Sequence, residues 1–163
     1  MELGQLLLLV HFLGFGLLFS TLVAGWILHG QYKNAKEFST KAVILRSLRP
    51  IGLLSPIGIL LMLITGIGNM HVRGLGLFSE AWLSTKIVVY AIASINGIVF
   101  GARAGKRGKL IGLMADGSAP QGTDKSVDAL DRQLRLFYII QFVLLLIILT
   151  LSIVKPGRYG TPA

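Results

Sequence analysis

Two ionisable side chains lie inside long apolar stretches of the sequence, and they are its most unusual candidates for chemistry. His11 lies within the apolar run 3–28, and Lys86 lies near the beginning of the run 81–100. Ionisable residues inside membrane segments are costly and mark functional sites. A neutral imidazole is a good iron ligand, and a lysine ammonium can bind a carboxylate. We therefore take His11 and Lys86 as the candidate catalytic and cofactor-binding residues, with His11 as the metal ligand.

Each of these candidates has a plainer alternative. A neutral His11 side chain can hydrogen-bond to a neighbouring helix, and Lys86, which follows Trp82, can extend its ammonium to the membrane surface. His71 lies in the segment expected on the same side as His11 and is a candidate second axial ligand. His29 shares the helix face of His11 but lies about 27 Å further along at 1.5 Å per residue, so the two histidines cannot bind one atom.

Four apolar runs must carry these residues, and each is long enough to cross a bilayer. They cover residues 3–28, 51–67, 81–100 and 136–154, and a membrane helix needs about 20 apolar residues. The chain of 163 residues is 53% hydrophobic and 14% charged, whereas soluble domains have about 25% charged residues. The sequence predicts an all-α integral membrane protein, with one transmembrane domain over residues 1–163. We expect an up-down four-helix bundle with helices at about 3–30, 50–70, 80–103 and 125–155.

The basic residues predict the orientation of this bundle. Lysines and arginines give the chain a net charge of +9, and they gather in the expected loops 31–49 and 104–124. Basic loops stay on the cytoplasmic side of a membrane, so both termini are expected outside. Because this rule accounts for the charge, we expect no nucleic-acid partner. The expected partners are membrane lipid and either other subunits of a membrane complex or further copies of the chain.

A row of small residues bears on helix packing, and the lack of cysteine in the chain and of acidic residues in the apolar cores bears on the possible chemistry. Gly97, Gly101 and Gly105 follow Ala93 at four-residue spacing, a pattern that predicts close helix packing in lipid. The chain has no cysteine, which excludes thiolate metal sites and disulfides. No acidic residue lies within the apolar cores, and this argues against a proton-driven transporter.

Several short motifs resemble a known family when they are read in order. They are Leu9-Val10-His11-Phe12, Arg46-Ser47-Leu48-Arg49 followed by Pro56, Thr65-Gly66, Trp82-Leu83-Ser84-Thr85-Lys86 and Val154-Lys155-Pro156. The chain resembles the bacterial four-helix membrane protoporphyrinogen oxidase family and its uncharacterised and copper-resistance-type relatives. At Asn96-Gly97 it departs from the family, whose third helix carries a further histidine.

That resemblance implies a multi-pass protein of the bacterial inner membrane that binds haem b and oxidises protoporphyrinogen. His11 would be the haem or catalytic histidine, and Lys86 with Arg46 or Arg49 would face the carboxylates of the tetrapyrrole or support the fold. The leading hypothesis is a haem- or tetrapyrrole-binding membrane protein; if it is an enzyme, we expect an oxidoreductase acting on a tetrapyrrole or in a quinone-linked step. The alternative is a non-enzymatic structural subunit of a larger membrane complex.

Overall fold

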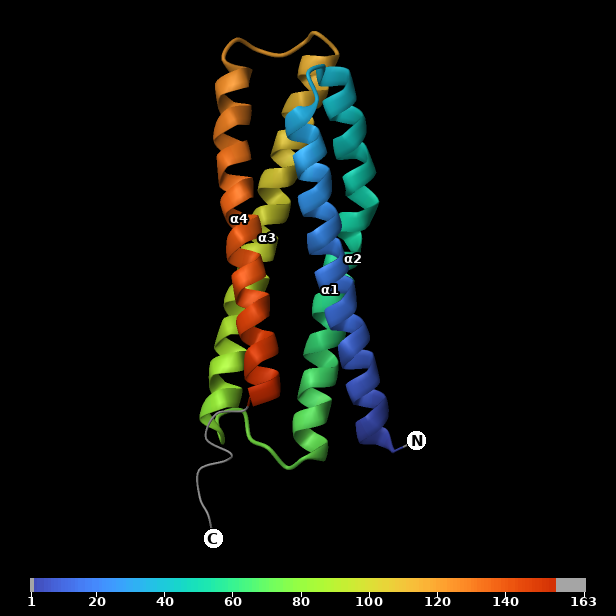
Figure 1. Cartoon of the computed structure of the whole chain (residues 1–163), viewed down its shortest axis with the longest axis vertical. Coiled ribbons are helices and arrows are strands. Elements are labelled where there is room, and N and C mark those ends of the chain that lie inside the picture. The colour runs from blue at the N-terminus through green and yellow to red at the C-terminus, as the bar shows by residue number, and fades with distance from the viewer. Residues whose placement is uncertain (1, 155–163) are drawn as a thin grey trace.

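The computed structural model describes residues 2–154, and these residues form a bundle of long helices (Figure 1). The helices are α1 (Leu3–Asn34), α2 (Phe38–Val72), α3 (Ala81–Ala115) and α4 (Thr123–Val154). Each is long and apolar enough to cross a membrane, and no strand occurs between residues 2 and 154. The predicted all-α architecture with four membrane helices is confirmed.

The helices pack as two antiparallel hairpins. α1 lies along α2 and α3 lies along α4, whereas α1 and α4 make few contacts. The α1–α2 and α3–α4 connections lie together at one end of the bundle, at the top of Figure 1, which we name the two-loop end. The beginning of α1, the α2–α3 connection and the end of α4 lie at the opposite end of the bundle, which we name the terminal end. The segments predicted to be cytoplasmic thus share one end; which side of a membrane that end faces stays a prediction.

The helices extend further than their apolar runs. Residues 38–49 and 104–115, which were predicted as parts of loops, are helical, and α4 begins at Thr123. The expected ends followed the apolar runs, but lysine, arginine and leucine favour helix in water as well as in lipid. Pro50 and Pro56 consequently lie inside α2. Residue 155, the predicted end of the fourth helix, lies outside the described residues.

Close helix packing occurs at other glycines than those predicted. A Cβ atom built on Gly58 would lie 2.9 Å from the carbonyl oxygen of Gly14, so the backbones of α1 and α2 meet there. In contrast, a Cβ atom on Gly97, Gly101 or Gly105 would meet no atom within 4 Å. The prediction of close packing through these three glycines is wrong: no neighbouring helix lies against them, and of this row only Ala93 packs into the buried core.

Two small clusters of buried side chains hold the bundle together. One lies at mid-length and contains Leu22, Ala93, Tyr138, Leu145 and Ile148. The other lies near the two-loop end and is formed by Tyr32, Ile111 and Val127. Each cluster joins residues of both hairpins, and together they fix the hairpins on either side of the cavity described next.

Candidate ligand cavity and buried polar cluster

A cavity of about 990 Å³ lies between the two hairpins in the half of the bundle nearer the two-loop end. All four helices contribute to its wall, with α2 and α3 supplying most of the lining residues. Its volume lies at the upper end of the range of about 300–1,000 Å³ that is usual for small-molecule sites. We refer to it as the inter-hairpin cavity.

Five glycines of α3 line one wall of the inter-hairpin cavity. The α3 glycines that line it are Gly97, Gly101, Gly105, Gly108 and Gly112. None of them would bring an added Cβ atom within 4 Å of a neighbouring atom. On the opposite wall, Pro56 lacks the N–H that would bond to the carbonyl of Gly52 in a regular helix, and both residues line the cavity. The glycines therefore leave open space along this wall.

The polar groups of the cavity are arranged along its length. Arg46, Arg49 and Lys109 lie towards the two-loop end. Deeper in the bundle, the amide of Asn96 donates from Nδ2 to Oε1 of Gln141 at 2.8 Å. No aspartate or glutamate is among the lining residues. The cavity therefore has a cationic end and a mostly apolar interior, which suits an amphipathic ligand with an anionic group.

A buried ionic cluster adjoins the cationic end. The Arg107 side chain is 2% exposed and lines the cavity. Its Nη1 donates to Oδ1 of Asp131 at 2.9 Å and to Nδ1 of His29 at 3.0 Å. Because a guanidinium can only donate, His29 Nδ1 accepts, so a neutral His29 carries its proton on Nε2. The Arg107 guanidinium also lies over the Tyr32 ring, 4.5 Å from its centroid.

Three atoms of this cluster are buried without a hydrogen-bond partner among the described residues. They are His29 Nε2, Tyr32 Oη and Arg107 Nε. An unsatisfied buried polar group costs about 1–3 kcal/mol, so this cluster is under-satisfied by its own side chains. His29 lies between the rings of Tyr32 and Tyr138, with centroid distances of 6.0 and 5.6 Å, and this stacking limits its movement.

His11 lies towards the terminal end, away from the inter-hairpin cavity. Its Nδ1 is 2.9 Å from Oγ1 of Thr65 on α2. The Thr65 hydroxyl donates its only proton to the carbonyl of Leu61, so His11 Nδ1 donates to Thr65. This is the interhelical hydrogen bond that stood as the alternative for His11. It leaves the lone pair of the neutral ring on Nε2, and a metal-binding role for this residue stays a prediction.

The other predicted site residues fall into separate places. Lys86 is half-buried and lies close enough to His11 for their charges to interact. His71 is exposed in the last turn of α2. Arg49 lines the cavity nearer the two-loop end. The structure therefore brings His11 and Lys86 together and separates both from Arg49. Within residues 2–154, no group of three or more His, Cys, Asp or Glu side chains could hold a metal ion.

The sequence did not identify Arg107, Asp131 or His29 as a group. Arg107 was counted among the basic residues of the expected loop 104–124, yet it follows Phe100 by seven residues and so shares its inward face. Asp131 follows the buried Val127 by four residues and precedes the buried Tyr138 by seven. Two signals were available in the sequence. Asp131 on α4 and Arg107 on α3 each lie at a helical spacing that places them on the buried face of their helix.

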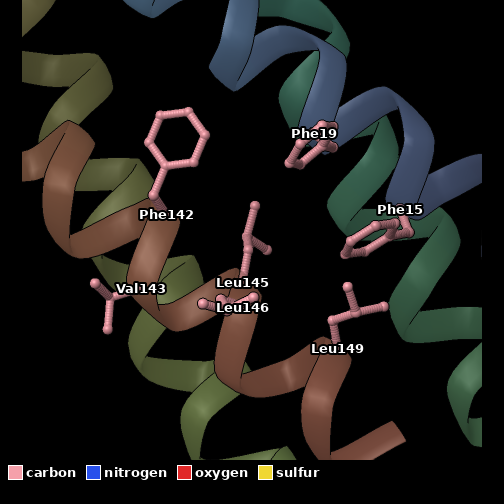
Figure 2. Close-up of a pocket in the computed structure, with 7 residues that line it drawn as sticks. All are labelled: Phe15, Phe19, Phe142, Val143, Leu145, Leu146 and Leu149. Atoms are coloured by element: carbon pink, nitrogen blue, oxygen red, sulfur yellow. The ribbon is translucent and has the colours of Figure 1, made fainter. Parts of the chain in front are cut away.

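A second, smaller cavity separates α1 from α4 nearer the terminal end. Figure 2 shows Phe15 and Phe19 projecting from α1 towards Phe142, Leu145 and Leu149 of α4. Its volume is about 230 Å³, and all its lining residues are apolar. It lies where α1 and α4 make few contacts. An apolar crevice of this size suits a hydrocarbon chain and offers nothing to orient a polar ligand.

Comparison with known proteins places the chain in a family. A profile described as predicted integral membrane protein (DUF2269) matches residues 5–156, which is nearly the whole sequence. A search of the curated proteins found no match, and neither did a search of the solved structures. The match agrees with the four helices of spanning length. The chain is therefore a multi-pass membrane protein that belongs to the predicted integral membrane protein family DUF2269.

Proposed function

We propose that this protein binds a hydrophobic, anionic small molecule in the inter-hairpin cavity, and that the molecule is a tetrapyrrole. The observation that carries the proposal is the cavity itself, with its glycine wall and its cationic end. Tetrapyrroles combine a flat apolar ring with carboxylates along one edge. This class of molecule is also what the resemblance to the four-helix protoporphyrinogen oxidase family implies.

The glycine wall supports a flat ligand on energetic grounds. Glycine in a helix interior is less favourable than alanine by about 1 kcal/mol. At Gly14 and Gly58 that cost is offset, because α1 and α2 approach closely there. At Gly101 and Gly105 no neighbouring helix takes up the space. What these glycines provide is room along the cavity wall, and a planar ring can use such room.

The charges support an acidic ligand. Arg46, Arg49 and Lys109 all line the same end of the cavity, and the lining contains no acid to balance them. Arginine binds carboxylates through paired hydrogen bonds. The resemblance assigned Arg46 or Arg49 to the carboxylates of a tetrapyrrole, and both residues are available at the cavity for that role.

The proposal concerns binding and does not depend on iron. His11 does not line the inter-hairpin cavity, so it is not placed to ligate a metal held there. Haem b bound through His11 rests on the chemistry of a histidine inside the membrane and on the resemblance, and oxidation of the bound tetrapyrrole rests on the resemblance alone. The binding experiment below therefore uses a metal-free tetrapyrrole.

Fluorescence titration of protoporphyrin IX into the protein, held in phosphatidylcholine discs, tests the proposal. We expect saturable binding by the natural protein. Gly101→Leu fills part of the cavity wall and should weaken binding by about tenfold or more, which corresponds to about 1.4 kcal/mol. Gly16→Leu is the matched control, because Gly16 also has no atom within 4 Å of an added Cβ atom but lies outside the cavity lining.

The controls separate a specific site from partition into the lipid. Empty discs give the background signal, and the melting temperature of each variant in detergent shows that it is folded. Binding by the natural protein no greater than that of empty discs would refute the proposal. Equal affinities of the Gly101→Leu and Gly16→Leu variants would also refute it, because the ligand would then lie elsewhere.

A further inference from the structure

We infer that Arg107 is the residue that binds the acid group of the ligand, and that Asp131, His29 and Tyr32 hold its guanidinium in position. This inference rests on the proposed function, and it adds which residue makes the cavity selective for a ligand with an acid group. It follows from the partners of Arg107, from its burial and from the atoms that its partners leave unused.

The hydrogen bonds of Arg107 occupy one part of the guanidinium. Nη1 makes the bonds to both Asp131 and His29. Nε lies on the other side of the group, where it forms an edge with Nη2, and Nε is buried without a partner among the described residues. Such an edge can donate two parallel hydrogen bonds to one oxyanion. Arg107 lines the cavity, and although Nε is closed off from it in this structure, a small turn of the side chain would present this edge to a carboxylate there.

The neighbours of Arg107 act on its position rather than on the ligand. Asp131 on α4 accepts a hydrogen bond from Nη1 of Arg107 at 2.9 Å and so anchors the guanidinium. The Asp131 side chain is 17% exposed. The Tyr32 ring supports one face of the guanidinium at 4.5 Å. His29 accepts a third contact from α1. With its rotation restricted in this way, Arg107 loses little conformational freedom when a ligand binds, and preorganisation of this kind strengthens binding.

The surrounding charges favour an anion at this end of the cavity. Asp131 balances the charge of Arg107, and the remaining charged lining residues are Arg46, Arg49 and Lys109. These three residues are exposed, so water and salt weaken their attraction for an anion. Arg107 is the buried cation of the lining, and a buried donor discriminates strongly against a ligand that lacks the acceptor.

A pair of related ligands tests this role directly. Protoporphyrin IX carries free carboxylates, and its dimethyl ester has the same ring without the negative charges. We expect the natural protein to bind the acid about tenfold or more tightly than the ester, which corresponds to about 1.4 kcal/mol. Arg107→Gln should bring the two affinities close together by weakening the acid and leaving the ester nearly unchanged.

Two further variants make the result specific. Arg103→Gln is the control, because Arg103 packs over Phe137 at 5.1 Å and does not line the cavity; it should keep the preference for the acid. Arg107→Lys retains the charge but loses the planar edge, and we expect it to keep only a small part of the preference. If the glutamine variant does not fold, the lysine variant still decides the matter.

The outcomes distinguish this inference from the proposed function. No binding of either porphyrin by the natural protein would refute the proposed function. Binding of both with equal affinity would leave that function standing and refute the recognition of an acid. A preference that survives in both Arg107 variants would overturn the role of Arg107. Phosphatidylglycerol added to the discs tests the source of the anion: displacement of the acid by this lipid would assign Arg107 to a lipid phosphate instead of a carboxylate.

Discussion

Alanine at Gly105 should stabilise the protein, whereas alanine at Gly25 should not. Both glycines lie in helix interiors, so each substitution removes the same intrinsic penalty of about 1 kcal/mol. Their surroundings differ. A Cβ atom at Gly25 would lie 2.8 Å from Oη of Tyr138, whereas a Cβ atom at Gly105 would meet nothing within 4 Å. The difference between the two variants therefore isolates the clash with Tyr138.

The size of the clash follows from how firmly Tyr138 is held. Its side chain is 4% exposed, and its ring packs against Phe100 at 4.9 Å and Trp26 at 5.6 Å. Adding a methyl group to a packed interior costs about 1–3 kcal/mol. Gly105→Ala should therefore be more stable than Gly25→Ala by about 1–3 kcal/mol, or roughly 2–12 °C in melting temperature at about 2–4 °C per kcal/mol.

Thermal unfolding in detergent, followed by circular dichroism, measures this difference. Tyr138→Phe removes the clashing oxygen, so Gly25→Ala should cost less in the Tyr138→Phe background than in the natural sequence. A double-mutant cycle of this kind isolates the interaction between two residues. Equal melting temperatures for Gly25→Ala and Gly105→Ala, or a clash of the same size without the hydroxyl, would refute this account of the α1–α4 contact.

Three further outcomes are expected. Asp131→Asn leaves Arg107 buried without its counter-charge and should lower stability by up to about 3–5 kcal/mol, whereas Asp128→Asn, at an exposed position of the same helix, should change the melting temperature little; equal effects would contradict the importance of the ion pair. Thr65→Val removes the acceptor for His11 and should lower stability by roughly 0.6 kcal/mol, the average for such bonds in membranes. Thr85→Val is the comparison, because the Thr85 hydroxyl bonds only to its own helix. A larger loss of stability in Thr85→Val than in Thr65→Val would argue against the interhelical bond. Cysteines introduced at Lys36 and Lys109, in a chain with no natural cysteine, should resist an impermeant thiol reagent added outside the cell, and labelling from outside would reverse the predicted orientation.

The sequence predicted the class of fold because each spanning helix needs a long apolar run, and hydropathy records such runs directly. It did not predict the helix ends, because hydropathy changes where a helix leaves the lipid and not where its backbone hydrogen bonds stop. Residues 38–49 and 104–115 illustrate this difference. The lengths of the helices therefore had to come from the structure.

The candidate site was less predictable for a geometrical reason. Four-residue spacing showed that Gly97, Gly101 and Gly105 share a face of α3, but it could not show whether a helix or a cavity lies opposite. In the same way, His29, Arg107 and Asp131 belong to three different helices, and their meeting depends on how each helix is rotated about its axis. Arg49 was identified by resemblance and does line the cavity, whereas His11 and Lys86 lie elsewhere.

The sparse contact between α1 and α4 has a consequence for the biogenesis of the protein. Each antiparallel hairpin holds most of its contacts within itself, so α1–α2 and α3–α4 can enter the membrane as separate units and dock afterwards. The Arg107 cluster lies across the interface between the two hairpins, because His29 belongs to the first hairpin and Arg107 and Asp131 belong to the second. The contacts that bury Arg107 are thus complete only when the two hairpins have joined, so the arginine proposed to bind the ligand is positioned only in the assembled bundle.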